Sequence, residues 1–164
     1  MTVSQLNALG SNDFVDQVGW VFEHSSWVAR RAWKHRPFAS LDDLHKRVCA
    51  EVTAASTPEK LALLRAHPDL GARARMSESS VKEQSGAGLD QLTPVEFARL
   101  HQYNEAYKTK FGFPFLFAVK GSDKLRILQA LETRMQTSPE DEFQEALKQV
   151  FRIARFRLED IIGR

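Results

Sequence analysis

The sequence contains a single cysteine, Cys49, among its 164 residues. One cysteine excludes an intramolecular disulfide and any zinc site built from several cysteines. Because free cysteines are usually buried, we expect Cys49 to pack as a small apolar residue. No apolar stretch approaches the length of a membrane span, and the amino end shows neither the basic nor the apolar region of a secretory leader. These absences favour a cytoplasmic protein that does not enter a membrane.

Neither sign of charge dominates the chain. Its 23 Lys and Arg stand against 21 Asp and Glu, which leaves a formal net charge of +2 at pH 7. Such a balance, without a long basic block, gives no reason to expect a nucleic-acid partner. The sequence also lacks glycine-rich phosphate loops and the Gly-x-Ser-x-Gly motif of serine hydrolases. No metal spacing is found among four of its histidines, which are His24, His35, His45 and His101. We therefore expect no metal and no cofactor.

Helix-start signals recur along the chain. Three helices are expected to begin at a hydroxyl residue followed by proline, at Thr57-Pro58, Thr93-Pro94 and Ser138-Pro139. Glu96 completes a capping box with Thr93, and Ser40 with Asp43 marks a further start. Together with the apolar spacing, these signals predict about eight helices, at residues 12–23, 26–35, 41–54, 58–66, 78–86, 94–110, 123–135 and 139–161. We expect residues 1–164 to form one compact all-α domain.

One segment, Phe111–Gly121, does not fit a helix. It is apolar and aromatic, but it contains a proline and two glycines. No other segment offers it a convincing partner strand, so we expect an extended loop threaded against the core. Loops with so much apolar surface often form the wall of a functional site.

His67 is the first candidate for chemistry. The run Leu61–Ala66 continues a helix, and Pro68 ends it because proline lacks an N–H and pushes the preceding residue toward extended geometry. His67 therefore stands at a forced helix exit, where an imidazole that titrates near neutral pH can take or give a proton. The alternative is a histidine that merely caps the carboxyl end of the helix.

A polar face follows at Ser80, Glu83 and Gln84. Their i, i+3, i+4 spacing places them on one side of a helix, where they could serve acid–base chemistry. Ser-x-x-Glu is also the capping-box pattern, so the pair could simply begin the helix. With Ser77 as the N-cap instead, the helix is longer and the three side chains are left for other work.

Arg157 is the third candidate. The final helix carries an apolar stripe that predicts a buried face, made of Phe143, Leu147, Val150, Phe151, Ala154, Leu158 and Ile161. Arg157 lies beside this stripe, whereas Arg152 lies opposite it. A buried guanidinium needs an anion, so Arg157 either binds a substrate group or pairs with a core carboxylate.

The motifs together resemble the 2-oxo-4-hydroxy-4-carboxy-5-ureidoimidazoline (OHCU) decarboxylase family. The resemblance is carried, in this order, by His67-Pro68-Asp69-Leu70, Ser80-x-x-Glu83-Gln84-x-x-Ala87-Gly88-Leu89 and Lys110-Phe-Gly-Phe-Pro-Phe115 with Ala118-Val119. Further similar stretches are Glu23-His-Ser-Ser-Trp27, Arg36-Pro37-Phe38 and Ile153-Ala-Arg-Phe-Arg157-Leu158. The resemblance covers nearly the whole chain.

This resemblance implies an all-helical, cofactor-independent carboxy-lyase, commonly a homodimer, that converts OHCU to (S)-allantoin in urate degradation. The implied catalytic residues are His67, as proton carrier, and Glu83. The implied substrate contacts are Pro68, Ser80, Gln84, Phe113, Phe115, Phe117, Ala118, Val119 and Arg157.

Two departures from the family pattern are visible. Ser25-Ser26-Trp27 replaces a Ser-Pro-Trp sequence, and the segment between His67 and Ser80 is a few residues shorter than expected. Two other readings of the chain remain open: a helical binding module without chemistry, and an enzyme of the same fold with a different substrate.

Overall fold

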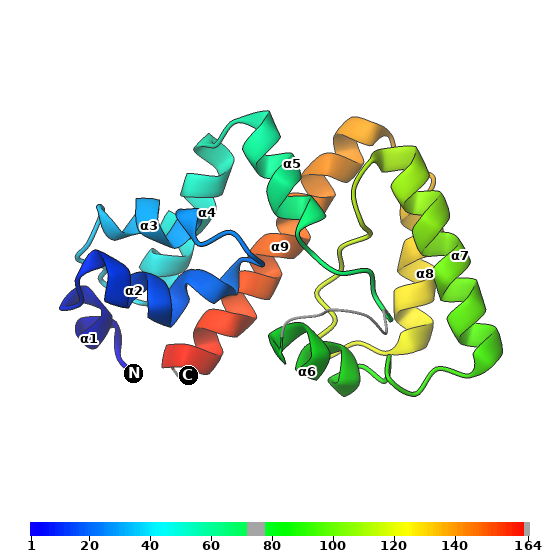
Figure 1. Ribbon diagram of the computed structural model, residues 1–164, viewed down its shortest axis with the longest axis horizontal. Coiled ribbons are helices and arrows are strands. Elements are labelled where there is room, and N and C mark those ends of the chain that lie inside the picture. The colour runs from blue at the N-terminus through cyan, green and yellow to red at the C-terminus, as the bar shows by residue number, and fades with distance from the viewer. Residues whose placement is uncertain (72–77, 163–164) are drawn as a thin grey trace. The chain divides into compact units, whose positions relative to one another are not determined.

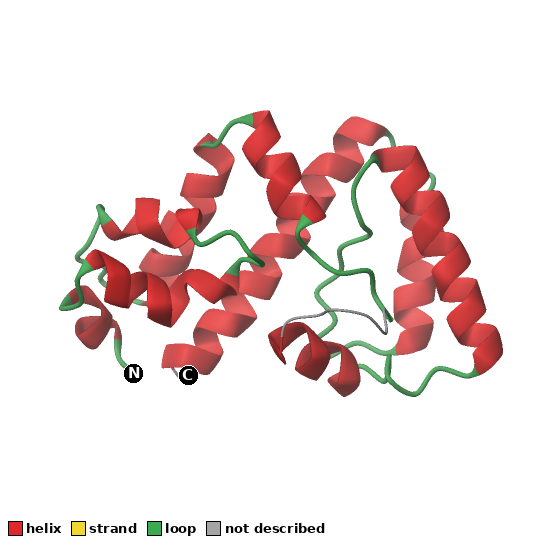
Figure 2. Ribbon diagram, in the orientation of Figure 1, coloured by secondary structure: helices red, strands yellow, loops and turns green. Residues whose placement is uncertain are grey.

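The computed structural model describes residues 1–71 and 78–162, and these residues form helices joined by loops with no strand among them (Figures 1 and 2). The all-α prediction is confirmed. The chain divides into two compact units, one made of Met1–Ala66 with Phe151–Arg164 and the other of His67–Val150. Each unit is described by itself below.

The first unit is a bundle of short helices in which α2, α3 and α4 pack in succession. Its elements are α1 (Val3–Asn7), α2 (Ser11–Val18), a 3₁₀ turn (Gly19–Val21), α3 (Trp27–Trp33), α4 (Leu41–Ala54), α5 (Thr57–Arg65) and the last part of α9 (Pro139–Ile162). Leu6, Phe14, Val28 and Leu44 are fully buried in its core. Cys49 is partly buried, and burial raises the pKa of its thiol to about 12. The thiol is therefore protonated and unreactive near neutral pH, as expected of a packing residue.

Three local predictions in this unit were wrong. α1 was missed, although Thr2 and Gln5 form a complete capping box that the sequence displays. The helix expected at 12–23 ends at Val18 and gives way to the 3₁₀ turn. The N-cap of α5 is Ser56 rather than Thr57, because Glu59 stands three residues after Ser56 and completes the box.

The second unit contains α6 (Glu78–Gly86), α7 (Pro94–Phe111), α8 (Lys124–Arg134) and the first part of α9. α7 begins at the predicted capping box of Thr93 and ends at Gly112, whose positive φ of 80° closes the helix. α7 and α8 run side by side (Figure 1). The connection between them is the predicted extended aromatic loop, with its apolar side chains almost all buried.

A buried polar cluster holds this loop in place. Tyr107 of α7 donates its hydroxyl hydrogen to Glu142 Oε1, and Arg134 Nε donates to the same oxygen at 2.7 Å. Arg134 also donates from NH1 to the carbonyl of Leu116, in the middle of the loop. From α9, Gln149 Oε1 accepts the N–H of Ala118 at 2.9 Å. The loop backbone is thus fixed from two helices.

Burial raises the pKa of Tyr107 well above its usual value, and the hydrogen bond to Glu142 raises it further. Tyr107 therefore stays protonated and acts as a donor. Glu142 is fully buried and Arg134 nearly so, which makes their ion pair costly to break from either side.

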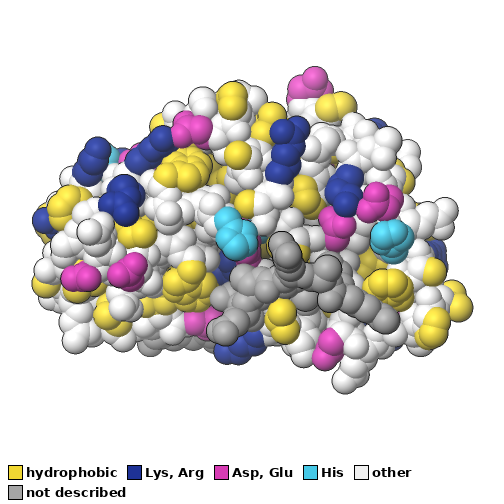
Figure 3. Space-filling model, viewed as in Figure 1, with side chains coloured by type: hydrophobic (Ala, Val, Ile, Leu, Met, Phe, Trp, Pro, Cys, Tyr) yellow, Lys and Arg dark blue, Asp and Glu magenta, His cyan; other side chains and the backbone are white. Residues whose placement is uncertain are grey.

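On the molecular face drawn in Figure 3, side chains of both charge signs are scattered and neither sign covers the surface. Within the described ranges, no helix combines the length and the apolar character needed to cross a bilayer.

We predict that Arg134→Met destabilises the protein by about 3–5 kcal/mol, because it leaves the carboxylate of Glu142 buried without its cation. The matched control is Arg99→Met, which removes the ion pair of Arg99 with Glu132 on the surface of the same unit. Urea unfolding should show a large loss for the first variant and almost none for the second. Equal losses would contradict the anchoring role of the cluster.

Candidate active site

His67 lies just beyond the carboxyl end of α5, as the sequence predicts. The helix ends at Arg65, and Ala66 occupies the C-cap position with its N–H donated to the carbonyl of Ala62 at 3.0 Å. The backbone C-cap of α5 is therefore Ala66, and His67 is the next residue along the chain. Its side chain is buried, with the whole residue only 6% exposed. It is the first residue of the second unit.

The α6 face that the spacing predicted is turned inward. Ser80 and Gln84 are buried and Glu83 is half-buried, whereas Val81 and Lys82 are exposed. Because α6 begins at Glu78, Ser80 lies inside the first turn, so the interpretation of Ser80 and Glu83 as a capping box is wrong. Ser77, the expected N-cap, lies outside the described residues.

Gln84 has a defined orientation. Its Oε1 accepts the N–H of Gly71 at 2.8 Å. The carbonyl end of the amide is thus committed to the backbone that follows His67, and the NH₂ end is the one that can serve a ligand. Gln84 can therefore contribute two N–H donors to a bound oxygen acceptor.

Gly71 is the one position near His67 where glycine is required by the backbone. Its φ is +73°, a region that L side chains rarely adopt. A Cβ added there would lie 2.6 Å from Leu100 Cδ2 of α7 and 3.2 Å from Leu92 Cδ1. The chain after His67 thus presses directly against α7.

The aromatic loop supplies mainly apolar surface to the unit. Phe113, Phe115, Ala118 and Val119 are buried, while Phe117 is partly exposed. Two of the loop's backbone groups bond to the helices described above, and the carbonyl of Val119 accepts the N–H of Ser122 at 2.9 Å. These hydrogen bonds therefore hold the backbone of the loop in a defined position.

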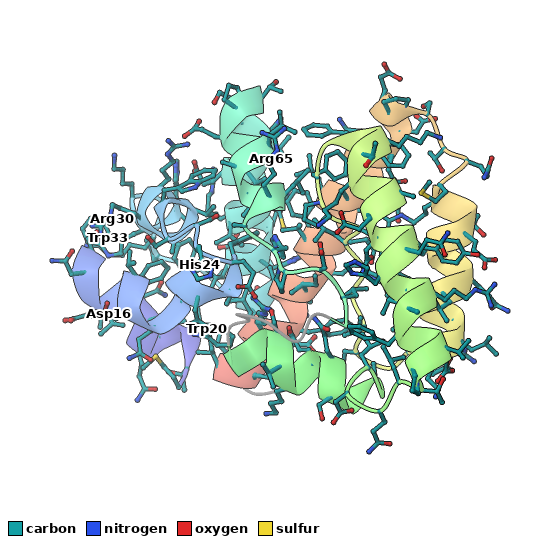
Figure 4. All side chains as sticks on the ribbon, turned by 45° about the vertical axis from the view of Figure 1, so that its right-hand side comes forward. Asp16, Trp20, His24, Arg30, Trp33 and Arg65 are labelled. Atoms are coloured by element: carbon teal, nitrogen blue, oxygen red, sulfur yellow. The ribbon has the colours of Figure 1, made fainter. Side chains whose placement is uncertain are left out.

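Arg157 belongs to the first unit and is only 2% exposed. Its Nη2 donates to Glu23 Oε1 at 2.8 Å, and its Nη1 donates to the carbonyl of Trp20 at 3.3 Å (Trp20 is labelled in Figure 4). Glu23 is 3% exposed, so this is a buried ion pair. Arg152 is exposed, as the stripe predicted.

Most of the candidates predicted from the sequence lie in one compact unit: His67, the α6 face and the aromatic loop all belong to His67–Val150. The sequence did not predict Glu23 as the partner of Arg157, although Glu23 opens one of the similar stretches quoted above. Nor did it predict the role of Asn104 of α7, which donates to the carbonyl of Leu70. In the described part of the chain, no three His, Cys, Asp or Glu side chains gather where they could hold a metal ion.

Comparison with known proteins identifies relatives of this arrangement. Residues 7–159 match the family described as OHCU decarboxylase. The chain is 46% identical over 161 residues to the 2-oxo-4-hydroxy-4-carboxy-5-ureidoimidazoline decarboxylase of Halalkalicoccus jeotgali, covering 98% of this chain and 92% of that protein. It is 47% identical over 161 residues to the uric acid degradation bifunctional protein PucL of Bacillus subtilis, with 98% of this chain covered but only 33% of that protein.

A solved structure shows the same fold. The crystal structure of an (S)-allantoin synthase superimposes with a TM-score of 0.82 at 34% identity, and the match covers 99% of this chain and 54% of that one. The chain thus spans about half of that protein and a third of the Bacillus relative.

We predict that Gly71→Ala costs more stability than Gly88→Ala. Both glycines have a positive φ, 73° and 81°, so each alanine should cost about 1–2 kcal/mol of backbone strain. At Gly88 the added Cβ meets nothing within 4 Å, whereas at Gly71 it overlaps Leu100. Overpacking should add roughly 1–3 kcal/mol at Gly71 only. Thermal unfolding of both variants checks the difference, and indistinguishable midpoints would show that the chain is not pressed against α7.

Proposed function

The chain belongs to the OHCU decarboxylase family, and we propose that it decarboxylates OHCU to (S)-allantoin with His67 as the proton carrier. The resemblance seen in the sequence is confirmed by the family match and by the relatives, so the protein is a carboxy-lyase of urate degradation. The observation that supports the role of His67 is its burial at a helix exit, in the same unit as the polar face of α6.

The chemistry can proceed without a cofactor because the substrate supplies its own electron sink. The carbon that bears the carboxylate stands next to a C=N group. When the bond to CO₂ breaks, its electron pair forms a C=C bond and the electrons of the C=N bond move to nitrogen, which takes a proton. The enol hydroxyl then loses its proton to become the carbonyl, and the neighbouring carbon gains a proton on one face. The sum is one proton taken up for each CO₂ released.

His67 is suited to these proton movements because an imidazole both accepts and donates near neutral pH. General acid–base catalysis of this kind is typically worth about 10²–10⁴-fold in rate. Glu83 is half-buried on the inward face of α6, and its carboxylate would orient the imidazole or share its proton. Delivery of the proton to one face of the carbon would give a single enantiomer of allantoin.

The remaining residues would hold the substrate. Ser80 and the NH₂ of Gln84 would bind oxygen atoms of the ureido group or ring. The apolar wall that grips the ring would come from Pro68 and from five residues of the loop, which are Phe113, Phe115, Phe117, Ala118 and Val119. Arg157, held in a fixed plane by Glu23 and Trp20, would bind an anionic or carbonyl part of the substrate.

The proposal includes a homodimer, as the family resemblance implies, and a cytoplasmic location, as the sequence features favour. The rival readings, a binding module and an enzyme with a different substrate, are separated from it by one assay. Urate oxidase and hydroxyisourate hydrolase generate OHCU in place, and circular dichroism follows the allantoin formed. Fast formation of (S)-allantoin supports the proposal, whereas racemic product at the spontaneous rate contradicts it.

We predict that His67→Asn abolishes turnover in this assay while the thermal midpoint stays close to that of the wild type. Asparagine keeps a polar group of similar size but cannot carry a proton at neutral pH. His101→Asn, at an exposed position of α7, is the matched control and should keep full activity. A stable His67→Asn protein with normal turnover would remove His67 from the mechanism.

We predict that Arg157→Lys lowers kcat/KM by the worth of one charged hydrogen bond, about 1.5–3 kcal/mol or roughly 10- to 150-fold. Lysine keeps the positive charge beside Glu23 but loses the planar fork. Arg152→Lys, on the exposed face of the same helix, should leave kcat/KM unchanged. If Arg157→Lys is less stable but has wild-type kcat/KM, the arginine serves only the ion pair with Glu23.

A further inference from the structure

Three residues on one ridge of α7 contact the three residues that follow Pro68. Leu100, Asn104 and Lys108 are spaced four apart, so they lie along the same side of the helix. Lys108 Nζ donates to Asp69 Oδ2 at 2.9 Å, and Asn104 Nδ2 donates to the carbonyl of Leu70 at 3.0 Å. Leu100 packs against Gly71 so closely that a Cβ would lie 2.6 Å from it. The segment Asp69–Gly71 therefore runs antiparallel along α7.

Asn104 is the central contact of this ridge. It is 3% exposed, and its Nδ2 group donates to the carbonyl of Leu70. Among the described residues, its Oδ1 is buried and has no hydrogen-bond partner. The unsatisfied Oδ1 lowers stability, whereas the Nδ2 bond satisfies the buried carbonyl of Leu70, so the two effects oppose each other in the free energy of folding. The clearest effect of the asparagine is therefore to fix the backbone at Leu70.

Lys108 adds an ion pair at the end of the ridge. Its hydrogen bond to Asp69, followed by the one to Glu105, raises the pKa of the ammonium group above its usual value. The side chains of Lys108 and Asp69 are 33% and 26% exposed, so the pair is worth little for stability. It does, however, fix the side chain that stands two residues after His67.

Resting on the proposed function, we propose that Asn104, assisted by Lys108, is a positioning residue for His67. His67 is followed directly by Pro68, whose φ is restricted by its ring. The bonds of α7 to Asp69 and Leu70 therefore set where the chain leaves His67, relative to the α6 residues Ser80 and Glu83. Asn104 acts through the backbone and does not itself move a proton.

The rate of proton transfer depends steeply on this geometry. A misplacement of about 1 Å far from the reacting atoms can cost about 10²-fold in rate. Loss of the Leu70 bond should therefore lower kcat more than it lowers substrate binding, because the proposed binding side chains Ser80 and Gln84 are not themselves substituted and the bond of Gln84 to the Gly71 N–H is retained. Substitution of a residue that served only stability would leave both kcat and substrate binding unchanged.

The experiment compares Asn104→Leu with the wild type for kcat, KM and thermal midpoint in the coupled OHCU assay. We expect kcat to fall by about 10- to 100-fold. KM should change by less than about threefold. The midpoint should shift little, because leucine fills the site and removes the unsatisfied Oδ1, which offsets the loss of the donor to the Leu70 carbonyl. Unchanged kcat, or a change confined to KM, overturns the proposal.

A second variant keeps the proposal testable if Asn104→Leu does not fold. Lys108→Met removes the ion pair with Asp69, and its control is Lys124→Met, which removes a similar pair with Glu96 in the same unit. We expect a several-fold lower kcat for Lys108→Met only, and equal kcat values would overturn the proposal. An inactive wild type would instead refute the proposed function, so the two failures are distinguishable.

Discussion

The structure of the second unit depends on the close seating of Asp69–Gly71 against α7. Gly71 has a φ of +73°, and a side chain at this position would also overlap Leu100. The N–H of Gly71 donates to Gln84 Oε1, and the carbonyl of Leu70 accepts a hydrogen bond from Asn104 Nδ2. Because the ring of Pro68 restricts its φ, this seating limits the directions in which the chain leaves the buried His67.

α7 also helps to hold the aromatic loop in place. Tyr107 stands three residues after Asn104 and bonds to Glu142, which in turn pairs with Arg134. Arg134 holds the carbonyl of Leu116 in the aromatic loop. One helix therefore organises both the chain after His67 and the loop of phenylalanines.

Local signals were enough to predict most of the fold from the sequence. Pro68 predicted the end of α5, Thr93 with Glu96 predicted the start of α7, and the glycines and proline of Phe111–Gly121 predicted a loop rather than a strand. The i, i+3, i+4 spacing predicted the inward face of α6. Errors arose where two hydroxyl residues competed for one cap, as at Ser56 and Thr57. The catalytic and binding roles remain predictions.

The partners of buried polar groups could not be predicted, because they come from distant parts of the chain. Glu23 meets Arg157 across 134 residues, and Asn104 meets Leu70 across 34. No local pattern distinguishes Asn104 from an ordinary polar residue on a helix surface. Only the fold shows that it is buried and aimed at the backbone beside His67.

The seating of Asp69–Gly71 on α7 is tested most directly by hydrogen exchange at the amide of Gly71, followed by NMR. We expect slow exchange, comparable to amides in the middle of α7, because the N–H is bonded to buried Gln84 and the backbone is packed against Leu100. Exchange as fast as that of an exposed loop amide would show that the segment is not seated on α7 and would contradict the account.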